Sequence, residues 1–398
     1  MKLFLLICFF IFNFMNAQAS SLIDIAQQSL EKNIVSLPRG EFLAAGGNQF
    51  GSLWTRDFCF SVPALLTLKK YSLVKNQLSY LINNRRSDGL IPIYADSIHP
   101  IKRVILGSVN QTLGTSIHFK MKKNIKPFFK ASGKFSTIDA NLLVLKASYE
   151  YYQTTNDIEW WNYNQNAFLE LYKYYDAFFE DGLIYQGAFA DWQDSSNRQG
   201  KTFFTNLLYL DVTKLFQFQS LDEISLLTQK IHETFYDLNT GLYFSVLGSP
   251  QISLDGILWA IDKKLMPMTD LLYERLKQHL LWNQFNFPGF ATYPSYPLKS
   301  LAFHVRMAGL NEYHGNLSWS WLMAYSSLVA FKQGDFQEAA RIKKNIEQII
   351  LRDQMVGEIY LSNSNYPPFR GPFYRSEAPF SWGAAFVIEM LKAQESLL

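Results

Sequence analysis

Cysteine is scarce in this chain, and charged residues are both few and balanced. Two of the 398 residues are cysteines, and one of them, Cys8, lies in an apolar N-terminal stretch. If that stretch is removed as a signal peptide, Cys59 has no cysteine to pair with, which argues against a scaffold held by disulfides. Charged residues make up 18% of the chain, and 37 basic against 34 acidic residues leave a net charge of +3. Such a weak charge does not indicate a nucleic-acid partner.

The sequence also lacks the short motifs that mark metal, nucleotide and serine chemistry. It contains no Cys-x-x-Cys and no His-x-x-x-His, so a metal site is not indicated. No glycine-rich loop lies between a strand and a helix, so nucleotide binding is not indicated either. The absence of Gly-x-Ser-x-Gly weakens the case for a serine hydrolase. We therefore expect no metal and no cofactor.

The first 19 residues form a separate segment. Lys2 is followed by an apolar stretch over 3–14 and then by Ala17-Gln18-Ala19. A positive start, a short apolar run and an Ala-x-Ala site are typical of a secretory signal peptide. An uncleaved membrane anchor is the alternative, but the run is short for a membrane span. We predict cleavage near Ala19, export to the periplasm or the exterior, no stable membrane insertion afterwards, and a single catalytic domain over 20–398.

Apolar residues recur at helical spacing through most of the remaining chain, which is 48% hydrophobic overall. The predicted helices span 22–34, 58–82, 138–152, 166–179, 203–218, 224–235, 268–281, 317–331, 336–351 and 382–397. Strand patterns are short, at 183–185, 242–246 and 358–361. The pattern predicts an all-α protein with a few short strands in its loops.

Loops that combine charged and aromatic residues precede several of these helices. The apolar helices that follow them begin near 58, 139, 203, 256, 317 and 381, at intervals of roughly 60 residues. The longer first interval holds a lysine-rich stretch at 120–134. Six helical hairpins closed into a ring form an (α/α)6 barrel, whose inner helices bring the polar loops to one end. This convergence predicts a cleft at that end.

Carboxylates beside aromatic residues are the remaining candidates for chemistry. Glycoside hydrolysis needs two facing carboxyl groups: one donates a proton to the leaving oxygen, and the other activates water or attacks the sugar. The candidates are Asp191 and Asp194, near Trp192, and Glu358 and Glu377, near Tyr360, Tyr374 and Trp382. An apolar surrounding raises the pKa of a carboxyl group and suits the acid. For Asp194 and Glu377, capping of the following helix is a competing explanation.

Several motifs resemble those of the six-hairpin glycosidases, which include glucoamylases, trehalases, neutral invertases and amylo-1,6-glucosidase-like debranching enzymes. Trp54-Thr55-Arg56-Asp57 resembles the W-[TI]-R-D signature of glucoamylases and neutral invertases. Tyr313-His314-Gly315-Asn316, followed by Ser318-Trp319, is similar to the invertase motif Y-H-N-G-G-S-W. Gly357-Glu358-Ile359-Tyr360, with the later Phe380-Ser381-Trp382, resembles the P-E-Y-Y-D…Q-T-W ending of invertases. The resemblance spans 54–382 and is carried by motifs in order.

The resemblance implies how the sugar is held and which residue is the base. It implies that Glu358 is the catalytic base, or the nucleophile if the enzyme is retaining, with Glu377 as the alternate. It also implies that Arg56 and Asp57 hold hydroxyls of the sugar at the cleavage point, beside Trp54. Binding at a terminal sugar suggests exo-action.

The resemblance is less uniform around the acid. Asp194, with Arg198 four residues on, is similar to an Asp–Arg pattern of trehalases and processing α-glucosidases, which implies that Asp194 is the acid. Glucoamylases have the acid directly after a tryptophan, where this chain has Gln193, so Asp191 stays open as the alternate. The acid motif of invertases is not found here, which argues against sucrose as the substrate.

Other residues of the polar loops are candidates for sugar binding. Asp139 either caps a helix or contacts the sugar. Trp192 and Trp382 either stack on sugar rings or belong to the core. We expect His314 and Asn316 to line the cleft.

We predict from these observations an exo-acting glycoside hydrolase whose partner is an α-glucosidic oligosaccharide and whose acid/base pair inverts the anomeric configuration. Two alternatives stay open. One is a non-catalytic carbohydrate-binding protein on the same toroid, and the other is a sugar epimerase, which works with histidine acid/base pairs.

Overall fold

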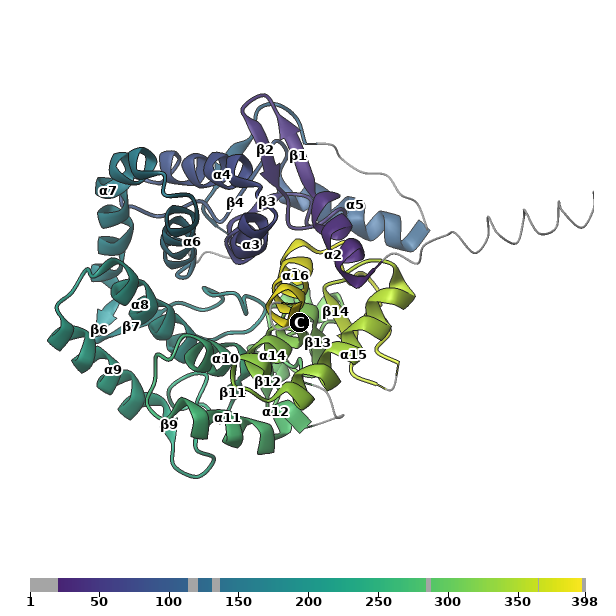
Figure 1. The fold of residues 1–398 in the computed structure, drawn as a ribbon. Helices are drawn as coiled ribbons and strands as arrows, with labels where there is room; N and C mark the ends of the chain where they lie inside the picture. The colour runs from purple at the N-terminus through teal and green to yellow at the C-terminus, as the bar shows by residue number, and fades with distance from the viewer. Residues whose placement is uncertain (1–20, 114–120, 131–136, 284–287, 364, 396–398) are drawn as a thin grey trace, which may run out of the picture.

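The computed structural model describes residues 21–113, 121–130, 137–283, 288–363 and 365–395. A ring of six helices forms its centre, in which each helix packs against the next and the last closes on the first (Figure 1). These inner helices are α3 (Thr55–Thr67), α6 (Ala140–Thr155), α8 (Phe203–Phe216), α10 (Leu254–Asp262), α14 (Ser320–Lys332) and α16 (Ser381–Glu395). They begin close to the six predicted positions, and the (α/α)6 barrel is confirmed.

Each inner helix packs against the outer helix of its own hairpin, and α6 also packs against α4. The outer helices are α4 (Tyr71–Asn83), α7 (Ile158–Lys173), α9 (Leu221–Phe235), α11 (Thr269–Gln278), α15 (Phe336–Asp353) and α2 (Leu22–Glu31). The sixth hairpin joins the two ends of the chain, because α2 packs against α16 (Figure 1). The ring is therefore closed by residues near opposite ends of the sequence.

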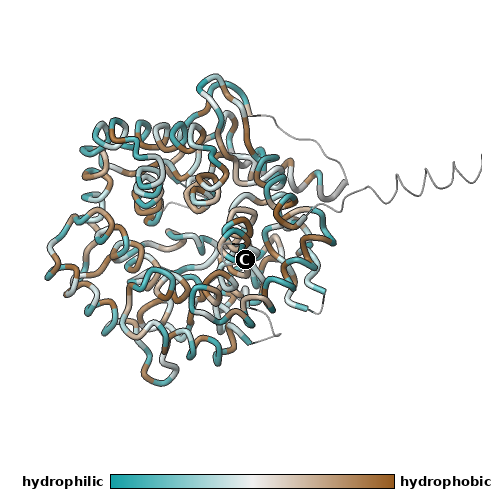
Figure 2. The backbone as a smooth tube through the Cα atoms, viewed as in Figure 1, coloured by the Kyte–Doolittle hydropathy of each residue, from teal (hydrophilic) through white to brown (hydrophobic). Residues whose placement is uncertain are grey.

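Inner and outer helices differ in how apolar residues are distributed around them. Along α14, every residue from Ser320 to Ala330 is buried, so this helix has no solvent face. Along α15, the buried residues are Ala339, Ile342, Ile346, Ile349 and Ile350, which form one stripe at helical spacing. Figure 2 shows this difference as apolar inner helices surrounded by outer helices of alternating polarity.

Short extended segments lead into several inner helices and help to position their first turns. Strand β3 (Leu53–Trp54) precedes α3, β11 (Ile252–Ser253) precedes α10, and β13 (Leu317–Trp319) precedes α14. They pair antiparallel with β4 (Tyr94–Asp96), β12 (Thr292–Tyr293) and β14 (Ile359–Leu361), and β4 also pairs with β5 (Lys126–Phe128). The remaining strands lie in connections: β1 (Ile34–Leu37), β2 (Gly40–Leu43), β6 (Phe179–Glu180), β7 (Leu183–Gln186), β8 (Gly200–Lys201), β9 (Tyr236–Asp237) and β10 (Leu242–Tyr243).

The structure differs from the predicted helices at several points. The helix expected over 58–82 is two helices, α3 and α4, because the chain turns between them at Lys69, whose φ is 59°. The apolar periodicity continues through this turn, since both helices of the hairpin bury an apolar face. The helix expected over 268–281 is likewise divided, into α11 and α12 (Leu280–Asn283), and helices α5 (Pro100–Leu113) and α13 (Phe303–Met307) were not expected at all.

The proposed signal peptide over 1–19 lies outside the described residues, and so does part of the lysine-rich stretch. Within the described ranges, no helix is both long enough and apolar enough to cross a membrane. Cys59 is buried in the core, with 3% of its surface exposed.

Candidate active site

A cleft with a cavity volume of about 80 Å³ lies where loops before the inner helices meet. Residues before and within the first turn of α3 line one side, and the loop before α8 lines another. The segments before α14 and α16 complete the wall. The lining residues are Phe50, Trp54, Arg56, Asp57, Trp192, Asp194, Tyr313, Trp319, Glu358, Phe380 and Trp382. Four of the six loops that were predicted to converge thus line the cleft, while those before α6 and α10 do not, and three of the lining side chains are carboxylates.

Asp194 lies on the wall formed by the loop before α8. Its side chain is 35% exposed, and Arg56 Nη1 lies 2.9 Å from its Oδ2 atom. The same guanidinium donates through Nε to Asp139 Oδ2 at 2.7 Å and through Nη2 to the carbonyl of Ala190 at 3.2 Å. Burial raises the pKa of Asp194, and the charge of Arg56 opposes that shift. Arg56 is therefore fixed in place and holds Asp194 toward the cleft.

Glu358 lies directly before β14, and its carboxylate is held on both oxygens. Tyr313 donates its hydroxyl to Oε1, and Tyr374 donates its hydroxyl to Oε2. The backbone N–H of Glu377 donates to Oε2 at 3.2 Å. Burial raises the pKa of Glu358 to about 7, although the two tyrosine hydroxyls stabilise the ionised form. The carboxylate is thus buried, oriented and close to titration at neutral pH.

Asp57 is the third carboxylate of the cleft, in the first turn of α3. Burial is the main cause that raises its pKa to about 8, and repulsion by Glu358 adds to it. At neutral pH this carboxyl is mostly protonated and can donate a hydrogen bond to a hydroxyl group. That property suits a residue that holds a sugar.

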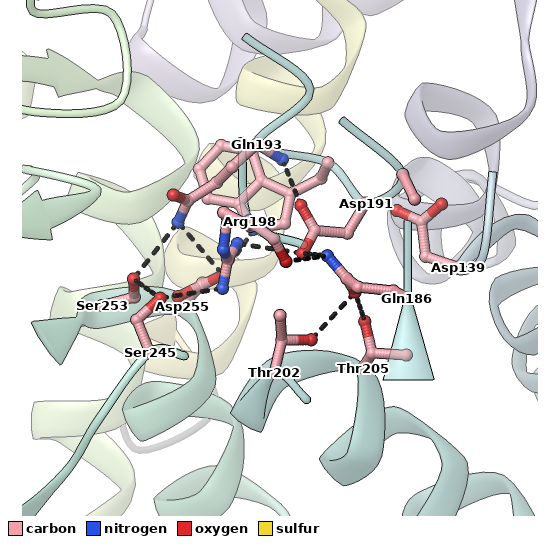
Figure 3. Close-up of polar contacts among 12 residues, drawn as sticks. Asp139, Gln186, Asp191, Gln193, Arg198, Thr202, Thr205, Ser245, Ser253 and Asp255 are labelled. Atoms are coloured by element: carbon pink, nitrogen blue, oxygen red, sulfur yellow. Dashed lines mark hydrogen bonds and ion pairs between the residues drawn. The ribbon is translucent and has the colours of Figure 1, made fainter. Parts of the chain in front are cut away.

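The alternate acid, Asp191, is not among the lining residues and has 1% of its surface exposed. Its carboxylate pairs with Arg198 Nη1 at 3.1 Å and accepts from Gln186 Nε2 at 2.9 Å and from the backbone N–H of Gln193 at 3.0 Å. Figure 3 shows these contacts. Asp191 therefore stabilises the loop that carries Asp194 from inside.

The alternate base, Glu377, is also buried and absent from the lining. Its Oε1 atom accepts from the backbone N–H of Asn48 at 2.6 Å, and its Oε2 atom accepts from the backbone N–H of Phe50 at 3.3 Å. A Cβ atom at Gly46 would lie 2.4 Å from its Cγ atom, so this loop needs glycine there. Glu377 anchors the loop over 46–50 and does not cap α16.

Arg198 was expected to bind substrate, but it is a buried partner of two aspartates. Besides Asp191, it lies 4.0 Å from Asp255 Oδ2, and its Nη2 atom donates to Ser245 Oγ at 2.9 Å (Figure 3). The indole N–H of Trp192 donates to the same Asp255 carboxylate. This polar network fixes the position of Trp192 in the cleft wall from below.

Three other predicted binding residues also lie behind the lining. Asp139 is fully buried and reaches the cleft only through Arg56; although it stands at the N-cap position of α6, its side chain makes no capping bond. His314 has 1% of its surface exposed and contacts Ser195. The backbone of Asn316 binds Glu312 and Ser362. The tryptophans Trp54, Trp192 and Trp382 do line the cleft.

Tyr313 and Phe50 were not predicted to take part in the site, and Tyr374 was noted only as an aromatic residue near the candidate carboxylates. Tyr313 stood in the motif that includes His314, so the motif located it without showing its role. Tyr374 and Phe50 follow no recognised motif, and only the folded loops bring them to Glu358 and Trp54. In the parts of the chain that the structure describes, no group of three or more His, Cys, Asp or Glu side chains could hold a metal ion.

No protein-family model and no curated relative matches this sequence. Solved structures do resemble the fold. A rhamnosidase from Klebsiella oxytoca with rhamnose bound superposes with a TM-score of 0.63 at 13% identity, over 96% of this chain and 64% of that one. This chain thus spans less than two thirds of that rhamnosidase.

Two further structures match over nearly their whole length. A GH63 mannosylglycerate hydrolase from Thermus thermophilus, in complex with Tris and D-glycerate, has a TM-score of 0.63 at 14% identity, over 92% of this chain and 99% of that one. A variant of a glycosidase has a TM-score of 0.61 at 13% identity, over 96% and 98% of the two chains. The chain therefore has the six-hairpin (α/α)6 fold of these glycoside hydrolases. At such identities the likeness shows the fold alone.

Proposed function

We propose that this protein is a glycoside hydrolase in which Asp194 is the general acid and Glu358 the general base. The observation that carries the proposal is the cleft itself. Two carboxylates from different loops, each held by its own set of donors, face one space walled by Trp54, Trp192 and Trp382. A pair of carboxyl groups is what glycoside hydrolysis requires, and aromatic ring faces can pack against a sugar ring.

The contacts of the two carboxylates support this division of roles. Both oxygens of Glu358 accept hydrogen bonds from tyrosines, which favours the ionised form that a base needs. The charge of Arg56 is already balanced by Asp139, which is fully buried. Because Arg56 shares its charge between Asp139 and Asp194, burial still raises the pKa of Asp194, which supports giving the proton to Asp194. It would donate that proton to the glycosidic oxygen while Glu358 draws a proton from the attacking water.

The proposed substrate is an α-glucosidic oligosaccharide, cleaved from its end with inversion. The Arg56–Asp57 pair beside Trp54 supports binding of a terminal sugar, and inversion needs carboxyl groups about 6.5–9.5 Å apart. No histidine is found among the described residues that line the cleft, which disfavours an epimerase with histidine acid/base pairs. We also propose that the protein acts outside the cytoplasm, on the basis of the segment over 1–19.

The test is product release from maltose, isomaltose, trehalose, sucrose and maltotriose, with the anomeric configuration read by NMR. Asp194→Asn and Glu358→Gln should each lower kcat/KM by about a thousandfold. On α-glucosyl fluoride, whose leaving group needs little protonation, only Asp194→Asn should regain most activity. The opposite pattern would exchange the two roles. Sugar binding without hydrolysis by the wild type would favour the non-catalytic alternative.

A further inference from the structure

A buried contact links the loops of the two proposed catalytic carboxylates. Ser195, which follows Asp194 directly, places its hydroxyl oxygen 2.5 Å from His314 Nδ1. His314 follows Tyr313 directly, and Tyr313 donates its hydroxyl to Glu358. A continuous path therefore runs from Asp194 through Ser195, His314 and Tyr313 to Glu358, with one side-chain contact at each spatial step.

The surroundings hold this link rigidly. Ser195 and His314 have 2% and 1% of their surfaces exposed. The imidazole stacks on Trp319, with ring centroids 5.4 Å apart and planes 6° from parallel, and it meets Trp192 edge to face at 5.0 Å. The indole N–H of Trp319 donates to the carbonyl of Tyr313 at 2.7 Å. Both tryptophans line the cleft, so the contact between Ser195 and His314 lies immediately behind the cleft wall.

A serine beside a histidine also occurs where serine is a nucleophile, but this pair is not placed for that chemistry. Neither residue lines the cleft, and both are buried behind the tryptophans. Burial, together with the positive charges of Arg198 and Arg56, holds the pKa of His314 well below its usual range. The ring is therefore neutral, and it can exchange one hydrogen bond with Ser195 in either direction.

We propose that Ser195 and His314 are positioning residues that fix the separation between the Asp194 and Glu358 carboxyl groups. The proposal rests on the proposed function and extends it. The two carboxylates come from loops before different inner helices. Movement of either loop relative to the barrel would therefore change the distance between them. Carboxyl spacing decides whether water fits between the base and the sugar, and a displacement of about 1 Å can reduce the rate about a hundredfold.

Two substitutions at His314 distinguish its contact with Ser195 from the packing of its ring against Trp319. His314→Phe keeps an aromatic ring against Trp319 but removes the Nδ1 atom. His314→Asn removes the ring but can keep a polar atom where Nδ1 lies. If the link positions the carboxylates, His314→Phe and Ser195→Ala should each lower kcat about 10- to 100-fold with little change in KM, and His314→Asn should retain more activity than His314→Phe. The double variant Ser195→Ala/His314→Phe should lose no more than either single variant, because both remove the same contact.

A matched control is available on an outer helix. His232 Nδ1 contacts the hydroxyl of Tyr243 at 2.8 Å, so His232→Phe removes a comparable histidine–hydroxyl contact away from the cleft. It should leave kcat unchanged. The proposal is overturned if Ser195→Ala keeps wild-type kcat, or if His314→Asn is more impaired than His314→Phe, since packing on Trp319 would then be the role of the ring.

Crystal structures of the same variants supply a readout that does not depend on activity. The distance between the Asp194 and Glu358 carboxyl carbons should change by more than the coordinate error in Ser195→Ala and His314→Phe, and should stay as in the wild type in His232→Phe. An unchanged distance would overturn the proposal. If the wild type hydrolyses no glycoside, the proposed function fails, and these distances alone decide whether the link positions the two carboxylates.

Discussion

Arg56 Nη1 lies 2.9 Å from Asp194 Oδ2, which ties the first turn of α3 to the loop before α8. The guanidinium can hold this position because its Nε atom is bound to Asp139, at the start of α6. One arginine thus joins the beginnings of three successive inner helices. The arrangement explains why a charged side chain is tolerated with only 4% of its surface exposed.

Loss of Arg56 should therefore reduce stability more than loss of a surface arginine. Arg56→Gln leaves Asp139 buried and without its counter-ion, and the free energy of unfolding at pH 7 should fall by about 3–5 kcal/mol. Burial already raises the pKa of Asp139 to about 6, so the loss should shrink as pH falls and this carboxyl takes up a proton. Urea unfolding at pH 5 and pH 7 measures both effects.

Arg85→Gln is the matched control for this prediction. Arg85 pairs with Glu170 at 2.7 Å on the surface, where the two side chains are 26% and 54% exposed. Its loss should change the unfolding free energy by no more than about 1 kcal/mol. Equal losses in the two variants would contradict the role given to Arg56.

The fold was largely predictable because its signal repeats along the chain. Apolar helices such as α8 and α14 are buried on all sides, and each follows a polar loop, so six repetitions defined the ring without any contact being known. The turn at Lys69 was not predicted because the apolar pattern continues through it. Helix α5 was not predicted because it lies outside the six hairpins whose repetition guided the prediction.

The site was predictable only in part, since a motif shows which residues are gathered and not which way they face. Arg56 and Glu358 were placed by motifs and do line the cleft. His314 and Arg198 came from equally polar loops, yet both side chains point into the protein, where Ser195 and Asp191 are their partners. No local sequence pattern predicts which way these side chains turn.

The two tyrosines on Glu358 should set the lower limb of the pH–activity profile. Their hydroxyls favour the ionised carboxylate, whose pKa is about 7 in the intact site. Tyr313→Phe removes one donor, so the pKa of Glu358 should rise and the fall of kcat/KM toward acid should begin at higher pH. The profile between pH 4 and 9 measures the shift.

Tyr360→Phe is the control for this shift. The Tyr360 hydroxyl accepts from the backbone N–H of Gly357 at 2.9 Å and belongs to the same segment as Glu358, but it does not bind the carboxylate. Its loss should leave the acid limb in place. If Tyr313→Phe also left the limb unchanged, the group that titrates there would not be Glu358.

Glu358 should also make the protein less stable as pH rises. Its pKa is raised from 4.5 to about 7 in the folded state, so between these values the folded protein holds a proton that the unfolded chain has released. Stability from this group therefore falls with pH across that window. Glu358→Gln removes the effect, and its unfolding free energy relative to wild type should rise by up to about 3 kcal/mol from pH 4 to pH 8. A constant difference across this range would show that the carboxyl is not shifted.

Glu377→Gln should affect the fold more than the chemistry. Its two oxygens accept backbone N–H groups of Asn48 and Phe50, and an amide nitrogen at either position would face a donor. The free energy of unfolding should fall by about 1–3 kcal/mol. Its kcat should fall less than about tenfold, against about a thousandfold for Glu358→Gln. A loss as large as that of Glu358→Gln, in a folded variant, would instead make Glu377 the base.

Asp191→Asn should distinguish a residue that supports the loop from inside from the residue that donates the proton. Asp191 is the buried partner of Arg198, so the variant leaves that guanidinium facing only Asp255 at 4.0 Å, and unfolding should become easier by about 3–5 kcal/mol. Any loss of kcat would arise from displacement of the loop that carries Asp194. It should therefore be similar for a glucoside and for α-glucosyl fluoride, because proton donation is not what is lost. Asp194→Asn should instead lose activity mainly on the glucoside. If fluoride restored the activity of Asp191→Asn and not that of Asp194→Asn, the proton donor would be Asp191, and Arg56 would hold Asp194 for another purpose.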